Sequence, residues 1–178
     1  MSVHSTYHDV SAVILAAGKG SRMSGMASLA KAFLPIAGRS ILDYISDNLS
    51  ELGIKKQCLI VSKEKNIFEY CRKNYPNIDG ICVQEHPNGT AAAVASAAPY
   101  FGKAPLDYAS NKLVLGVATK ASYVLICNGD VPFVSSCLLK EFINFSINKN
   151  LKFSLIATKM PNPKGYGRVL LDSKGRLK

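Results

Sequence analysis

The sequence has no apolar run of the roughly 18 residues that a membrane-spanning helix requires. Its first residues, MSVHSTYHD, are polar and lack the basic-then-apolar order of a signal peptide. We interpret residues 1–10 as a short tail that precedes the first strand. The sequence therefore predicts no membrane partner.

Cysteine is scarce and irregularly spaced, with five residues in all: Cys58, Cys71, Cys82, Cys127 and Cys137. The number is odd and no two stand at metal-ligand spacing. Three of them lie in apolar runs, where a free cysteine behaves as a small core residue. This usage indicates a reducing, cytoplasmic compartment.

Acidic residues are also few, at 12 Asp and Glu against 22 Lys and Arg, and the formal net charge is +10. A charge of this size raises the question of nucleic-acid binding. However, residues 149–178 hold eight Lys or Arg and one acid, so they carry +7 and leave only +3 for residues 1–148. No known nucleic-acid module or aromatic-interleaved basic stripe is present, and we predict no nucleic-acid partner.

What the sequence does contain is a regular alternation of strand-like and helix-like segments. With 48% hydrophobic and 19% charged residues, it belongs to neither the disordered nor the collagen-like class. The predicted strands are 11–17, 58–61, 78–83, 124–127 and 153–158, and the predicted helices are 41–52, 66–74, 89–98 and 137–147. Such alternation predicts a Rossmann-like, three-layer α/β/α fold with a mostly parallel sheet and right-handed crossovers.

Two segments interrupt this pattern. Residues 102–121 are long for one connection in a compact domain, and we interpret them as an insertion or a mobile loop. Residues 168–178 predict a strand, a tight turn and the start of a returning strand. We therefore expect one domain over residues 11–178 that is incomplete at its C-terminal end.

A glycine-rich turn, Gly18-Lys19-Gly20-Ser21-Arg22, follows the first predicted strand. Glycines let backbone N–H groups approach an anion closely, and the forked guanidinium of Arg22 suits phosphate oxygens. The turn matches neither the P-loop nor the Rossmann glycine spacing. It predicts a phosphate-binding loop, with an ordinary turn as the alternative.

A second polar loop, Gln84 to Thr90, lies between a strand and an alanine-rich helix. The Gln84 amide carries a donor and acceptors that can pair with a nucleobase edge. Gly89 and Thr90 begin the helix, where N–H groups lack partners within the helix. The alternative is a plain loop with a threonine cap, and His86 is more simply an exposed loop residue than a general base.

A third loop, Asn128-Gly129-Asp130-Val131-Pro132, comes directly after an apolar strand. A carboxylate at the end of a parallel strand is well placed to hold Mg²⁺ against phosphates. A simple turn aspartate is the alternative. Because the three loops follow three predicted strands, they can meet at one edge of the sheet.

These motifs resemble those of the sugar-phosphate nucleotidyltransferases, most closely the uridylyltransferase domain of the bacterial bifunctional enzymes that make UDP-N-acetylglucosamine. The resemblance runs from about Val13 to Leu177. It rests on Leu15 to Met23, on Lys31 before Leu34 to Gly38, and on Gln84, Gly89 to Ala91, Gly129 to Pro132 and Gly165 to Arg168.

The resemblance implies a role for each matching residue. The nucleotide would be bound by Leu15, Ala16, Ala17, Gly18, Gln84, Gly89, Thr90, Asn128 and Gly129. The triphosphate would be gripped by Arg22 and Lys31, the catalytic pair, Asp130 would bind Mg²⁺, and Gly167 would contact the sugar through its backbone.

The implied reaction joins UTP and N-acetylglucosamine 1-phosphate, with Mg²⁺ as cofactor, to supply cell-envelope precursors. The sugar phosphate attacks the α-phosphorus in line and pyrophosphate leaves, so no nucleophile or general base on the protein is needed. Two alternatives remain: a relative that uses another nucleotide or acceptor, such as a molybdenum cofactor guanylyltransferase, and a non-catalytic nucleotide-binding domain.

This sequence also departs from the family pattern. Ala30 stands where relatives usually have proline before the lysine. In the family, a sugar-binding glutamate and asparagine and a second metal ligand follow beyond the position of Gly167. We therefore expect that these 178 residues alone lack part of the sugar site and are inactive. The resemblance further implies a homo-oligomer formed through a region beyond this chain.

Overall fold

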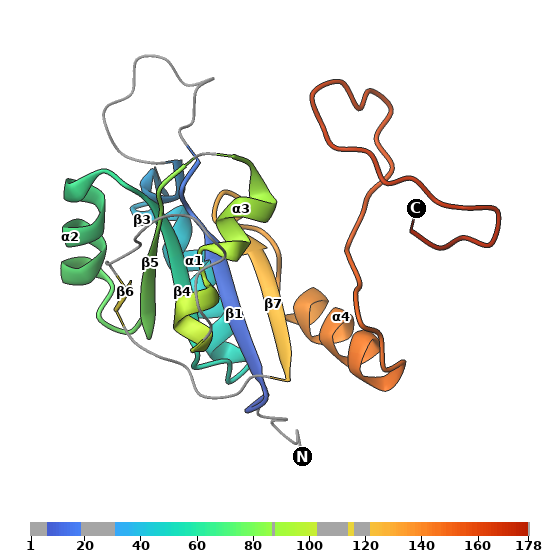
Figure 1. Cartoon of the computed structure of the whole chain (residues 1–178), viewed down its shortest axis with the longest axis horizontal. Coiled ribbons are helices and arrows are strands. Elements are labelled where there is room, and N and C mark those ends of the chain that lie inside the picture. Colours follow the sequence, from blue (N-terminus) through green and yellow to red (C-terminus); the bar gives the residue numbers. More distant parts are fainter. Residues whose placement is uncertain (1–6, 19–30, 87, 103–113, 116–121, 178) are drawn as a thin grey trace. The chain divides into compact units, whose positions relative to one another are not determined.

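The computed structural model describes residues 7–18, 31–86, 88–102, 114–115 and 122–177 (Figure 1). The chain forms two compact units, Met1–Lys140 and Glu141–Lys178. The first unit holds the sheet. The predictions of an N-terminal tail and of one domain over 11–178 stay predictions.

The sheet has five strands in the order β6-β5-β4-β1-β7. Their bounds are β1 Val10–Leu15, β4 Gln57–Ser62, β5 Gly80–Gln84, β6 Val114–Leu115 and β7 Tyr123–Asn128. Strands β5, β4, β1 and β7 are parallel, and only the short β6 pairs antiparallel, with β5. The predicted, mostly parallel sheet is confirmed.

The direction of the strand order reverses beside β1. From β1 the chain proceeds outward to β4 and β5, and then returns to place β7 on the opposite side of β1. In open parallel sheets, ligands bind beyond the carboxyl ends of the strands at such a reversal. The fold therefore points to the ends of β1 and β7 as the place for a ligand.

Helices cover both faces of the sheet. Figure 1 shows α3 (Thr90–Ala95) in front of it and α1 (Ile41–Glu51) behind it. On β4, Gln57 hydrogen-bonds to α1, whereas the next residue, Cys58, packs in the same cluster as Ala93 of α3. Successive strand residues point to opposite faces, so the three-layer α/β/α fold is confirmed. A third helix, α2 (Lys65–Asn74), packs against β4 and β5.

The alanine-rich segment lies directly against the sheet, as its small side chains predict. Ala93 and Ala97 are buried together with the strand residues Val13, Cys58, Ile60 and Cys82 and with Ala17 and Tyr100. The regular helix is shorter than the predicted 89–98, because α3 ends at Ala95 and a 3-10 helix, η2 (Ala98–Phe101), follows. Pro99 stands in the first turn of η2, where its missing N–H is tolerated.

The start and end of α1 also agree with the sequence. Ser40 is its N-cap, and the side chains of Ser40 and Asp43 each accept the other's backbone N–H, which makes a capping box. Gly53, just past the end, has a φ of +75°. This left-handed conformation favours glycine and ends the helix.

The helix α4 (Ser136–Asn148) confirms the predicted helix 137–147. The predicted strand 153–158 is wrong: these residues carry no strand, and Phe153 and Ile156 are exposed. A strand exists through hydrogen bonds to a neighbour, and in the described part of the chain none pairs with this segment. At the C-terminal end, the predicted turn is present, closed by one antiparallel bridge between Leu171 and Leu177.

Within the described ranges, no helix has both the length and the apolar character needed to cross a membrane. Most of the predicted insertion, 102–121, lies outside the described residues. Its residues Val114–Leu115 form β6 at the edge of the sheet.

Candidate nucleotide-binding site

The carboxyl ends of β1 and β7 stop side by side. Leu15, the last residue of β1, pairs with Asn128, the last of β7. Beyond Leu15 the chain stays on the sheet for a short distance, because the Ala16 N–H donates to the Ile60 carbonyl of β4 at 2.8 Å. Ala16 and Ala17 are buried and Gly18 is exposed. The backbone thus enters solvent at Gly18, where a Cβ would meet nothing within 4 Å.

Gly129 ties the two strand ends together. Its N–H donates to the Leu15 carbonyl oxygen at 2.8 Å. A Cβ on residue 129 would stand 2.6 Å from that oxygen and 3.3 Å from the Cβ of Ala32, so only glycine fits without a shift. This close approach fixes the backbone that carries Asp130 beside the end of β1.

Asp130 forms an ion pair with Lys31. The Lys31 Nζ donates to Asp130 Oδ2 at 2.9 Å, and the two side chains are 43% and 45% exposed. A pair this open to solvent contributes only about 0–1 kcal/mol to folding. The structure therefore brings together a cation that the sequence predicts to bind phosphate and a carboxylate that it predicts to bind metal. The contact between them contributes little to the stability of the fold.

The backbone at Lys31 is firmly anchored although its side chain is half-exposed. Lys31 begins the 3-10 helix η1 (Lys31–Phe33), in which Ala32 and Phe33 are buried. The ring of Phe33 packs edge-on against Tyr70, with centroids 5.6 Å apart, and lies 6.0 Å from Tyr75. Rotation of the lysine side chain is thus the main freedom left at this position.

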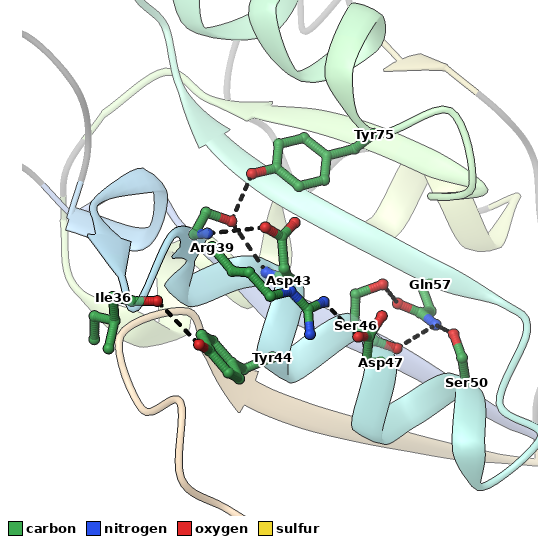
Figure 2. Close-up of polar contacts among 10 residues, drawn as sticks. Ile36, Arg39, Asp43, Tyr44, Ser46, Asp47, Ser50, Gln57 and Tyr75 are labelled. Carbon is green, nitrogen blue, oxygen red and sulfur yellow. Dashed lines mark hydrogen bonds and ion pairs between the residues drawn. The ribbon is translucent and has the colours of Figure 1, made fainter.

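A short hairpin connects η1 to α1 and fixes the position of one relative to the other. It consists of β2 (Pro35–Ile36) and β3 (Arg39–Ser40). Figure 2 shows its contacts with α1: the Tyr44 hydroxyl donates to the Ile36 carbonyl at 2.9 Å, and Arg39 pairs with Asp47 at 2.5 Å. Asp47 thereby raises the pKa of Arg39 by hydrogen bonding and charge.

The N-cap of α1 also hydrogen-bonds to Tyr75, the residue that follows the end of α2. The Ser40 and Tyr75 hydroxyls are 2.7 Å apart (Figure 2). Burial raises the pKa of Tyr75 to about 12, so the phenol stays neutral near pH 7 and can donate. This bond secures the α1 end of the segment that carries Lys31.

Gln84 and Gly89 meet at the end of β5. The Gln84 side chain is buried, at 8% exposed, and its Nε2 donates to the Gly89 carbonyl at 3.3 Å. One of the two N–H donors of the amide is therefore engaged, which leaves the second N–H and the amide oxygen to pair with a base. Gly89 has a φ of +90° and stands at the N-cap of α3, which begins at the exposed Thr90 as expected.

The loop around Gln84 lies at the same edge of the sheet as Asp130. β5 is separated from β1 by β4 alone, so the carboxyl ends of β5 and β1 are roughly 10 Å apart. That separation suits a nucleoside whose base and phosphates are bound at different strands. His86 is exposed, as expected.

Two predicted site residues stand apart from this group. Arg22 lies outside the described residues. Gly167 belongs to the second unit, where it is exposed in a turn that Arg168 closes by donating to the Pro163 and Tyr166 carbonyls, each at 2.6 Å. The roles of both residues stay predictions.

The described residues contain no group of three or more His, Cys, Asp or Glu side chains that could enclose a metal ion. Mg²⁺ does not need such a cage, because it commonly takes one or two carboxylates and completes its shell with phosphates and water. Asp130 offers one exposed carboxylate that already attracts a cation, the Lys31 ammonium. These residues fit a Mg²⁺ ion that arrives with phosphates.

The pairing of Lys31 with Asp130 was not predicted from the sequence. The two residues are 99 positions apart, and the sequence predicts a different ligand for each, phosphate for Lys31 and Mg²⁺ for Asp130. The available signal was their place in loops after two strands of one sheet, but only the strand order shows that those strands are neighbours. The contact of Gly129 with Leu15 was missed for the same reason.

The fold and this strand-end site agree with the nucleotidyltransferase class that the sequence motifs predict. The sequence matches the MobA-like NTP transferase domain over residues 12–172, and the chain belongs to that family. It is 31% identical to the bifunctional protein GlmU of Thermosynechococcus vestitus over 93% of this chain and 32% of that protein. With GlmU of Pelobacter propionicus it shares 32% over 95% of this chain and 33% of that protein. The chain thus spans about a third of the length of these relatives.

Solved structures agree on the fold. The crystal structure of Rv0371c from Mycobacterium tuberculosis superposes with a TM-score of 0.56 at 20% identity. The match covers 79% of this chain and 62% of that one.

Proposed function

We propose that this chain carries the nucleotide-binding part of a Mg²⁺-dependent uridylyltransferase that makes UDP-N-acetylglucosamine from UTP and N-acetylglucosamine 1-phosphate. The observation that carries the proposal is the Lys31–Asp130 pair at the reversal of the strand order. A cation and a carboxylate at that point suit a triphosphate and its metal. The similarity to GlmU supports this substrate class.

In this proposal the nucleoside lies across the ends of β1 and β5. The backbone of Leu15, Ala16, Ala17 and Gly18 contacts uracil and ribose, as do Asn128 and Gly129. The Gln84 amide oxygen, held in place by the Gly89 carbonyl, accepts the N3–H of uracil. Gly89 and Thr90 complete the base pocket.

The phosphates lie toward Lys31 and Arg22. Both cations neutralise charge that moves onto the leaving pyrophosphate as the sugar phosphate attacks the α-phosphorus in line. Bound Mg²⁺ would supply Lewis-acid neutralisation of the phosphate oxygens. Asp130 would hold this metal ion in position, and Gly129 fixes the backbone that carries Asp130. Gly167 would contact the sugar through its backbone.

The test is pyrophosphate release with each of the four nucleoside triphosphates, in the presence of N-acetylglucosamine 1-phosphate and Mg²⁺, using the protein with any flanking region that its gene encodes. UTP should support turnover best. Asp130→Asn should abolish it, whereas Glu51→Gln, which removes another exposed carboxylate at the last residue of α1, should not. Turnover that survives Asp130→Asn would refute the metal assignment.

A second candidate is guanylyl transfer to the molybdenum cofactor. It is favoured by the match to the MobA-like domain and by the Gln84 amide oxygen, which can accept the N1–H of guanine as well as the N3–H of uracil. Preferential use of GTP, with turnover that requires the molybdenum cofactor and not N-acetylglucosamine 1-phosphate, would establish it. A third outcome, UTP binding in a calorimeter with no turnover of any triphosphate, would indicate a non-catalytic nucleotide-binding domain.

A further inference from the structure

Lys31 occupies one of the two carboxylate oxygens that a metal could use at Asp130. Its ammonium lies 2.9 Å from Asp130 Oδ2, a hydrogen-bonding distance that takes up one acceptor site of that oxygen. A divalent ion on this carboxylate would also stand within a few ångströms of the ammonium, where like charges repel. The two cations therefore compete for Asp130.

The lysine is able to leave. Its side chain is 43% exposed, and the ion pair that holds it is of the weakly stabilising, solvent-exposed kind. The backbone beneath it is fixed by the buried neighbours Ala32 and Phe33, so a rotation of the side chain redirects the ammonium without movement of η1. The same long side chain can then reach a phosphate bound at the strand ends.

We propose that Lys31 is a place-holding cation, which neutralises Asp130 in the nucleotide-free protein and transfers to the phosphates when a metal–nucleotide complex arrives. This inference rests on the proposed function. It predicts that free metal binds weakly and that nucleotide strengthens metal binding, because nucleotide offers the ammonium another partner. By linkage, metal must strengthen nucleotide binding by the same factor.

The experiment measures Mn²⁺ binding by the loss of the free-ion electron paramagnetic resonance signal, first without nucleotide. Lys31→Met should bind Mn²⁺ more tightly than the wild type, by up to about fivefold, since the competing pair is lost. Asp130→Asn should bind no Mn²⁺ at this site. The matched control is Lys55→Met, which removes an exposed charge before the start of β4, at the opposite end of the strands, and which should leave the affinity unchanged. Circular dichroism verifies that each variant is folded.

The second arm repeats the titration with UTP present and no sugar phosphate, and a protein-free titration of UTP gives the Mn²⁺ bound by nucleotide in solution, which is subtracted. Wild-type affinity for Mn²⁺ should rise, and Lys31→Met should lose most of that rise. Equal affinities of wild type and Lys31→Met without nucleotide would overturn the inference, and so would equal gains by Lys31→Met and Lys55→Met. If Asp130→Asn binds Mn²⁺ as the wild type does, the metal assignment fails as well. Failure of UTP to bind would overturn the proposed function while the nucleotide-free comparison still decides whether Lys31 competes for Asp130.

Discussion

The backbone N–H of Gly129 donates to the carbonyl oxygen of Leu15 at 2.8 Å, across the ends of two parallel strands that are 114 positions apart in the chain. This bond joins the loop that carries Asp130 to the loop that begins at Gly18. It sets how closely the backbone that carries Asp130 approaches the end of β1. The candidate site thus rests on a backbone contact that any side chain at residue 129 would disturb.

Replacing Gly129 with alanine tests this contact. The new Cβ would stand 2.6 Å from the Leu15 oxygen, so the strand ends must separate. We expect a loss of about 1–3 kcal/mol in the free energy of unfolding, as is usual for overpacking in a tight place. Urea denaturation measures it. Gly18→Ala is the matched control, since a Cβ there meets nothing within 4 Å, and equal losses in the two variants would contradict the argument.

The capping box of α1 gives a second prediction. Ser40→Ala removes the acceptor for the Asp43 N–H, 3.1 Å away, and should cost about 1 kcal/mol of stability. Asp43→Ala removes the reciprocal bond, 2.8 Å long. Because the two bonds form one unit, the double variant should lose less than the sum of the single losses in urea denaturation. Strict additivity would show that the bonds act independently.

The elements near the site could be predicted because their signals are local. Ser40 and Gly53 bound α1 through cap chemistry that depends on neighbours in the chain. The alanine-rich segment and the apolar runs of β1, β4 and β7 are likewise recognisable from their own residues. The strand predicted at 153–158 failed because a strand also needs a partner, which no local pattern supplies.

For the candidate site, the sequence predicts a set of residues but not their geometry, and the roles of these residues stay predictions. Glycine, lysine and aspartate at strand ends indicated phosphate and metal chemistry. The contacts Lys31–Asp130 and Gly129–Leu15 depend on β7 lying beside β1, which follows from tertiary packing. The engaged Nε2 of Gln84, which changes what that side chain can read, was likewise visible only in the structure.

The cysteines differ sharply in accessibility, which a thiol reagent can report. Cys58, Cys71 and Cys82 are buried, and burial raises the pKa of Cys71 and of Cys127 to about 12. Cys137 is exposed. At pH 8 we expect one of the five thiols to react rapidly with a disulfide reagent and the rest to react only in urea. Cys137→Ser should remove the rapid phase, and rapid reaction that persists in this variant would contradict the burial pattern.

Tyr75 makes the stability of the first unit sensitive to alkaline pH. Burial is the main cause that raises its pKa from 10.0 to about 12, so the folded protein holds the proton more tightly than the unfolded chain does. This contribution is complete below pH 10 and is lost as pH rises from 10 to about 12. The free energy of unfolding from urea titrations should therefore fall across that range.

The control is Tyr75→Phe, which keeps the ring against Phe33 but cannot ionise. This variant should show a shallower fall in the free energy of unfolding. Some fall should remain, because burial also raises the pKa of Tyr100. An equally steep fall in Tyr75→Phe would show that the buried phenol of residue 75 is not the group responsible.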